Sequence, residues 1–93
     1  MSLILKDPDA ALDYEVDWGD IYLGDDRIAS SFWTVLPGGD GAPTIELDEH
    51  DGRVARVSIA GGRAGHVYRL SNQMVTEGGL QDRRSFMVRV EKR

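Results

Sequence analysis

The sequence contains no cysteine, which excludes a disulfide framework, a thiolate metal site and a cysteine nucleophile. The longest apolar run near its start, Leu3–Leu5, is too short for a signal peptide or a membrane span, so no membrane partner is expected. Basic residues are in the minority, 11 against 16 acidic ones, so nucleic acid is not an expected partner either.

What is present fits one small soluble globular domain. Hydrophobic residues make up 41% of the chain and charged residues 29%, which is too apolar for a disordered segment. A chain of 93 residues has no room for a second hydrophobic core. Composition alone therefore predicts a folded domain and indicates no function.

The charges are unevenly distributed along the chain. Residues 1–51 hold 13 acidic and 2 basic residues, a net charge of −11, whereas residues 52–93 hold 3 acidic and 9 basic residues, a net charge of +6. Such asymmetry is typical of a charged tail, an assembly surface, or strands that pair across a fold.

Alternating apolar and polar residues predict an all-β fold. No run shows a sustained helical apolar stripe, and the clearest alternation, from Leu12 to Trp18, is apolar and acidic in turn. Glycine and proline clusters separate seven predicted strands: 2–6, 12–18, 28–36, 44–49, 53–60, 67–76 and 84–91. Strands this short, with turns every 8–12 residues, indicate a β-sandwich. Residues 1–9 are expected to form an N-terminal arm or edge strand, and residues 10–93 the sandwich.

A hairpin is predicted around Asp51-Gly52, and its register can be argued from side-chain matching. A two-residue turn would place the apolar Ile45 opposite the polar Ser58. A three-residue loop, 50–52, instead pairs core with core and opposite charges with each other: Ile45 with Val57, Leu47 with Ala55, Glu46 with Arg56 and Glu49 with Arg53. The sequence therefore favours the longer loop, with Gly52 in a left-handed conformation.

The segment Ala64-Gly65-His66-Val67-Tyr68 resembles the tyrosine corner of immunoglobulin-like and fibronectin-like sandwiches. This resemblance implies that strands 2–6, 12–18, 44–49 and 53–60 form one sheet and that strands 28–36, 67–76 and 84–91 form the other. It also puts Trp33 where such folds keep a core tryptophan. The residues expected to be structural are Tyr68, Gly65, Trp33, Trp18, Tyr14 and Gly52.

The residues that could carry chemistry are few, and we expect no enzyme. His50 and His66 fall in predicted turns, and the serines lack a nucleophile-elbow motif. The glycine-rich run 61–65 lacks the helix and lysine of a phosphate-binding loop. The acidic loops match no EF-hand spacing, although oxygen-rich loops of this kind can hold calcium. No catalytic residue, cofactor or metal ligand is therefore expected.

Motifs over nearly the whole chain, from about Lys6 to Arg93, resemble the phage fibre–tail adaptor proteins of tailed phages and prophages. They include Lys6-Asp7-Pro8-Asp9-Ala10, Val16-Asp17-Trp18, Leu23-Gly24-Asp25-Asp26, the Gly78-Gly79 turn and Val88-Arg89-Val90. The resemblance implies a non-enzymatic structural protein of the virion, in the tail or neck, made in the host cytoplasm and bound to other virion proteins. The alternative is a free-standing immunoglobulin-like module that binds a carbohydrate or host-surface ligand in an aromatic-lined groove.

The predicted topology suggests where contacts form. The outer face of one sheet is expected to be acidic and that of the other basic, the acidic residues being Asp13, Glu15, Asp17, Glu46 and Asp48 beside Arg56, and the basic ones Arg69, Arg89, Arg83 and Arg84. Opposed faces of this kind can join copies of the chain head to tail. The apolar arm residues Leu3, Ile4 and Leu5 are expected to pair along a sheet edge or be covered by a partner, so the expected interface residues are Leu3, Ile4, Leu5, Asp13, Glu15, Asp17, Arg69 and Arg89.

Overall fold

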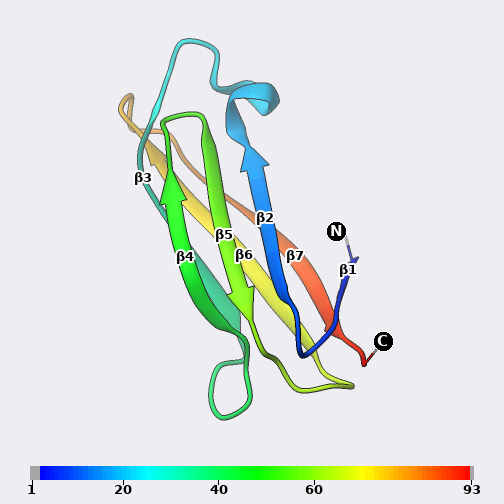
Figure 1. The fold of residues 1–93 in the computed structure, drawn as a ribbon. Helices are drawn as coiled ribbons and strands as arrows, with labels where there is room; N and C mark the ends of the chain where they lie inside the picture. The colour runs from blue at the N-terminus through cyan, green and yellow to red at the C-terminus, as the bar shows by residue number, and fades with distance from the viewer. Residues whose placement is uncertain (1–2, 93) are drawn as a thin grey trace.

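The computed structural model describes residues 3–92, which form seven strands and one short helical turn (Figure 1). The elements are β1 (Leu3–Lys6), β2 (Ala11–Asp17), the π-helical turn η1 (Gly19–Leu23), β3 (Ile28–Leu36), β4 (Thr44–His50), β5 (Val54–Ala60), β6 (Val67–Thr76) and β7 (Gln81–Val90). The expected all-β sandwich is thus confirmed, because a four-stranded sheet β1-β7-β6-β3 packs on a three-stranded sheet β2-β5-β4.

The sheet that holds β1 differs from the expected one. The sequence interpretation put residues 2–6 beside β2, but β1 runs parallel to β7, from Leu3 opposite Met87 to Lys6 opposite Val90. The chain then turns at Asp7, whose carbonyl accepts a hydrogen bond from the Ala10 N–H at 3.1 Å, before β2 begins. Proline at position 8 cannot donate a ladder hydrogen bond, so the strand ends there and the chain crosses to the other sheet.

A buried lysine anchors β1. Lys6 is 3% exposed, and its Nζ donates hydrogen bonds to the carbonyls of Gly61 at 2.6 Å and Asp7 at 3.0 Å. Burial lowers the pKa of this ammonium group, while the carboxylates of Asp7 and Asp9 act in the opposite direction. The lysine therefore ties the arm to the turn after β5.

Deleting residues 1–6 is expected to lower the free energy of unfolding by about 2 kcal/mol, because the half-buried Ile4 and the buried Lys6 leave the fold. The deletion also exposes the edge of β7, which favours association through unpaired backbone groups. Urea titration and size-exclusion chromatography measure the two effects. If neither stability nor oligomeric state changes, this role of the arm is wrong.

The core lies between the two sheets and is built from the inward side chains of each strand. β5 alternates strictly, with Ala55, Val57 and Ile59 buried. The buried apolar cluster is completed by Val16, Trp18, Leu23, Ile28, Trp33, Leu70, Met74, Phe86 and Val88. The period of two that predicted the strands thus also identifies most of the core.

The β4–β5 register differs from the expected one, and both of the alternatives weighed in the sequence are wrong. Glu49, not Glu46, lies opposite Arg56, and the pairing shifts by a bulge between Ile45 and Leu47. The turn forms one residue later than expected, around Gly52-Arg53, because the Asp51 carboxylate binds the backbone N–H groups that follow it. The bulge leaves Ile45 half-buried against the core but turns Leu47 outward, where it is 44% exposed.

Gly52 has a φ of +104°, so the expected positive φ is confirmed. We expect Gly52→Val to destabilise the protein by more than about 1 kcal/mol, because a β-branched residue resists this backbone region. A Cβ at this position would also lie 2.6 Å from Arg27 Nη2. Gly38→Val is the control, since Gly38 lacks a positive φ and has open space around it. Equal urea midpoints for the two variants would contradict the strain argument.

Candidate interaction surfaces

No metal-binding constellation occurs among residues 3–92, where no group of three or more His, Asp or Glu side chains is placed to hold an ion. His50 and His66 are both exposed, and His66 stacks on Tyr68 with ring centroids 6.3 Å apart. No helix in the same part of the chain is long and apolar enough to cross a membrane.

Most of the residues expected to be structural lie in or beside the core. Trp18 and Trp33 are buried, and the Trp18 Nε1 donates to Asn72 Oδ1 at 2.8 Å. The half-buried Tyr14 packs edge-on against Phe86, with ring centroids 4.7 Å apart. These aromatic side chains fill the space between the sheets and do not form a ligand-stacking surface.

Tyr68 and Gly65 form the corner before β6. The Tyr68 hydroxyl accepts a hydrogen bond from the Arg63 N–H at 3.2 Å, five residues upstream. Gly65 has a φ of +87°, and its N–H donates to the Val90 carbonyl at 2.7 Å. This is the geometry of a tyrosine corner. It closes the end of the sandwich where the last residues of β1 and β7 lie.

The outer face of the four-stranded sheet carries exposed apolar side chains at one end. In the cross-strand pairing, Leu5, Arg89 and Val67 lie side by side in one row. The next row holds Leu3, Met87, Arg69 and Leu36. We call these residues the apolar–basic patch: Leu3, Leu5, Leu36, Val67 and Met87, with Arg69 and Arg89 between them. Leu3 is 60% and Leu36 57% exposed, values far above those of core leucines.

The opposite outer face, on the three-stranded sheet, is acidic. Pairing puts Asp13, Ser58 and Leu47 in one row and Glu15, Arg56 and Glu49 in the next, with Asp17 beyond. We call Asp13, Glu15, Asp17, Glu49, Leu47 and Arg56 the acidic face. A groove of about 480 Å³ lies here, and its lining includes Asp13, Glu15, Leu47 and Arg56. Arg56 Nε lies 3.5 Å from Glu15 Oε2, so the single cation is neutralised within the face.

The structure places several expected surface residues elsewhere. Ile4 is half-buried against the core and does not belong to an outward surface. The Asp48 carboxylate accepts the Trp33 backbone N–H at 3.0 Å, so Asp48 bridges the edges of the two sheets and is not part of the acidic face. Arg84 lies over the Phe86 ring, 6.0 Å from its centroid, and not on the outer face of its sheet. In each case a shift of one residue along the strand determines which face of the sheet the side chain occupies.

Leu36, Val67, Met87 and Leu47 belong to the two surfaces but were not identified from the sequence. A signal for Leu36 was present, because segment 28–36 carries large apolar residues on both of its faces. Leu47 had no signal, since only the bulge in β4 turns it outward.

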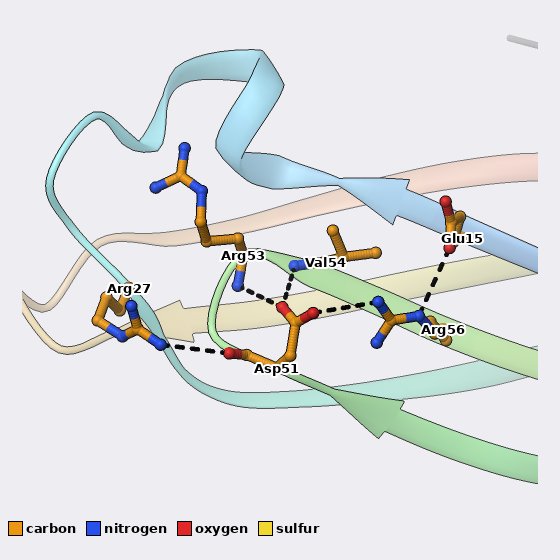
Figure 2. Close-up of polar contacts among 6 residues, drawn as sticks. All are labelled: Glu15, Arg27, Asp51, Arg53, Val54 and Arg56. Atoms are coloured by element: carbon orange, nitrogen blue, oxygen red, sulfur yellow. Dashed lines mark hydrogen bonds and ion pairs between the residues drawn. The ribbon is translucent and has the colours of Figure 1, made fainter.

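A hydrogen-bonded cluster closes the far end of the sandwich, around Asp51 (Figure 2). Asp51 Oδ1 accepts the N–H groups of Arg53 and Val54, each at 2.9 Å, and Oδ2 accepts Arg56 Nη2 at 3.1 Å. These backbone bonds, followed by the bond from Arg56, lower the pKa of Asp51 to about 2. Arg27 Nη2 also donates to the Asp51 carbonyl at 3.3 Å, which joins the chain segment before β3 to the hairpin.

Asp51→Asn is expected to flatten the acid dependence of stability. The folded-state pKa is lowered, so the carboxylate stabilises the fold above the unfolded value of about 3.9 and loses this effect as pH falls toward about 2. The difference in unfolding free energy between wild type and variant should thus be largest above about pH 4 and shrink toward pH 2. Urea titrations across this range measure it, with Asp40→Asn as the matched loss of an exposed carboxylate. A constant difference would contradict the prediction.

The sandwich, its tyrosine corner and its two exposed sheet faces define an immunoglobulin-like β-sandwich protein. The family model described as podophage GP4 fiber-tail adaptor protein gp77 matches residues 6–89, and the chain belongs to this family. The resemblance noted in the sequence is confirmed, and membership gives the protein a structural role in the phage tail.

A solved structure supports the fold independently. The solution structure of the PKD domain from KIAA 1837 protein is similar to this chain with a TM-score of 0.60 and 20% sequence identity. The similarity covers 98% of this chain and 79% of that chain. At this identity it shows the immunoglobulin-like fold alone. No curated protein matches the chain.

Proposed function

We propose that the protein is a non-enzymatic adaptor that joins other virion proteins in the tail through the outer faces of its two sheets. The observation that carries this proposal is the apolar–basic patch, where Leu3 and Leu36 are more than half exposed. Apolar side chains gathered on a sheet face are stabilised when a partner covers them. The family supports the setting, since its description is that of a fiber-tail adaptor. The protein is made in the host cytoplasm and built into the particle there.

The N-terminal arm contributes to this contact surface. Leu3 and Leu5 project from β1 on the outer side, while Lys6 is buried and holds the strand in place. An edge strand anchored in this way presents its apolar residues at a fixed position in the same cross-strand rows as Val67 and Leu36. We therefore expect residues 1–9 to act as a docked arm whose outer side faces a partner.

No observation favours the alternative of a free-standing carbohydrate-binding module. The groove on the acidic face has one aromatic residue in its lining, Tyr14, which is half-buried and packed on Phe86. Sugar-binding grooves of the kind expected would expose several aromatic rings for stacking. The surfaces fit protein partners better than they fit a small ligand.

The proposal is tested in the phage that encodes the protein. Deleting the gene should yield particles with incomplete tails or without fibres, as seen by electron microscopy, and wild-type protein should restore them. Complementation with Leu3→Asp/Leu36→Asp should fail, because the patch can no longer be covered, whereas Lys92→Glu, an exposed charge change outside both surfaces, should succeed. Complete, infectious particles without the protein would overturn the proposal.

A further inference from the structure

The apolar–basic patch and the acidic face lie on opposite sides of the molecule and are complementary in charge. The patch presents Arg69 and Arg89, and Arg89 Nε is paired with Glu91 Oε1 at 2.6 Å beside the two rows. The acidic face presents Asp13, Glu15, Asp17 and Glu49 around one arginine that is already paired. Two patches brought together would put like charges in contact, so a patch is not its own partner.

The spacing of the charges also matches. Arg69 lies opposite Met87, so Arg69 and Arg89 are diagonal neighbours on adjacent strands, about 7–8 Å apart. Asp13, Glu15 and Asp17 alternate along β2 and follow one another at intervals of about 7 Å. Arg69 of one molecule can therefore meet one carboxylate of another, and Arg89, whose Nε is paired with Glu91, can meet the next carboxylate through its Nη atoms.

The acidic face also has an apolar counterpart for the leucines of the patch. The bulge in β4 turns Leu47 outward beside the groove of about 480 Å³, on the edge strand opposite the acids of β2. A leucine side chain of the patch can enter this groove and contact Leu47 while the arginines meet the acids of β2 across it. Apolar contacts combined with charged pairs are usual in protein interfaces.

We propose that the apolar–basic patch of one molecule binds the acidic face of a second copy of this chain, head to tail. This contact deepens the proposed tail function by naming one partner. Because the two surfaces lie on opposite sheets, a bound pair of copies leaves one surface of each kind open. Repetition of such a heterologous contact closes into a ring or continues as a filament.

The test uses two variants that each destroy one surface. Leu36→Asp/Arg69→Glu removes the patch and keeps the acidic face, whereas Asp13→Lys/Leu47→Lys does the reverse. In sedimentation velocity at low salt, wild type should form oligomers, and these should dissociate as salt rises to about 0.5 M. Each variant alone should be monomeric, but an equimolar mixture should form a 1:1 heterodimer, because one intact surface of each kind remains. Lys92→Glu and Glu77→Lys, charge changes outside both surfaces, should associate like wild type.

Monomeric wild type at low salt and high concentration would overturn the proposal, and so would a mixture of the two variants that stays monomeric. Circular dichroism establishes whether each variant is folded. If the double variant of the patch does not fold, the single variant Arg69→Glu replaces it, and this smaller change should weaken association at least tenfold. The complementation experiment separates this contact from the tail function. If monomeric wild type restores complete particles, the contact between copies is wrong and the tail function stands.

Discussion

Replacing Asn72 by leucine is expected to destabilise the protein by about 3 kcal/mol or more. Asn72 is fully buried, and its Oδ1 accepts the Trp18 indole N–H at 2.8 Å. Its Nδ2 donates to Ser31 Oγ at 2.8 Å and to the Phe32 carbonyl at 3.3 Å. The asparagine thus links β3 and β6 to Trp18, the residue that follows β2. Leucine would leave the buried indole N–H without its acceptor.

A double-mutant cycle measures this network by urea titration. Trp18→Phe removes the indole N–H, so Asn72→Leu should cost less in that background than in wild type, by about 1 kcal/mol or more. Trp33→Phe is the matched control, because Trp33 is equally buried but its Nε1 has no hydrogen-bond partner among residues 3–92. Additive effects of Trp18→Phe and Asn72→Leu would show that the hydrogen bond contributes nothing.

Tyr68→Ala should cost about 3 kcal/mol or more, and Tyr68→Phe about 1 kcal/mol. The side chain is 4% exposed, so alanine leaves a cavity, whereas phenylalanine loses only the bond from the Arg63 N–H. Tyr14→Phe is the control, since Tyr14 is only half-buried and its contact with Phe86 is made by the ring. An unchanged urea midpoint for Tyr68→Ala would contradict the corner's structural role.

The strands were predictable because their signal is local. Alternation places Val57 and Ile59 on one side of β5 whatever the neighbouring strand is, and the glycine and proline clusters mark the ends. Sheet membership is not local, which is why β1 was assigned to the wrong sheet. Its place beside β7 depends on the burial of Lys6 against Gly61, a contact 55 residues apart in the chain.

The candidate surfaces were predictable in charge but not in shape. The acids of β2 and the arginines of β6 and β7 follow from strand alternation alone. The β4 register does not follow from alternation. The Asp51 carboxylate determines the position of the turn, and a bulge in β4 then shifts the pairing again. No pairing rule predicts both effects. Leu47 was therefore expected inside, and the apolar residue of the acidic face was missed.

The parallel pairing of β1 with β7 has a mechanical consequence. β1 begins at Leu3, opposite Met87, and β7 ends at Val90, opposite Lys6, so forces pulling the two ends of the chain apart act in opposite directions along neighbouring strands. Such a load shears the hydrogen bonds of β1 and β7 together and does not open them one at a time. Lys6, bonded to Gly61, and the Glu91 N–H, bonded to the Lys6 carbonyl at 2.9 Å, lie within this clamp. A domain held in this way can transmit tension between whatever is attached at its two ends.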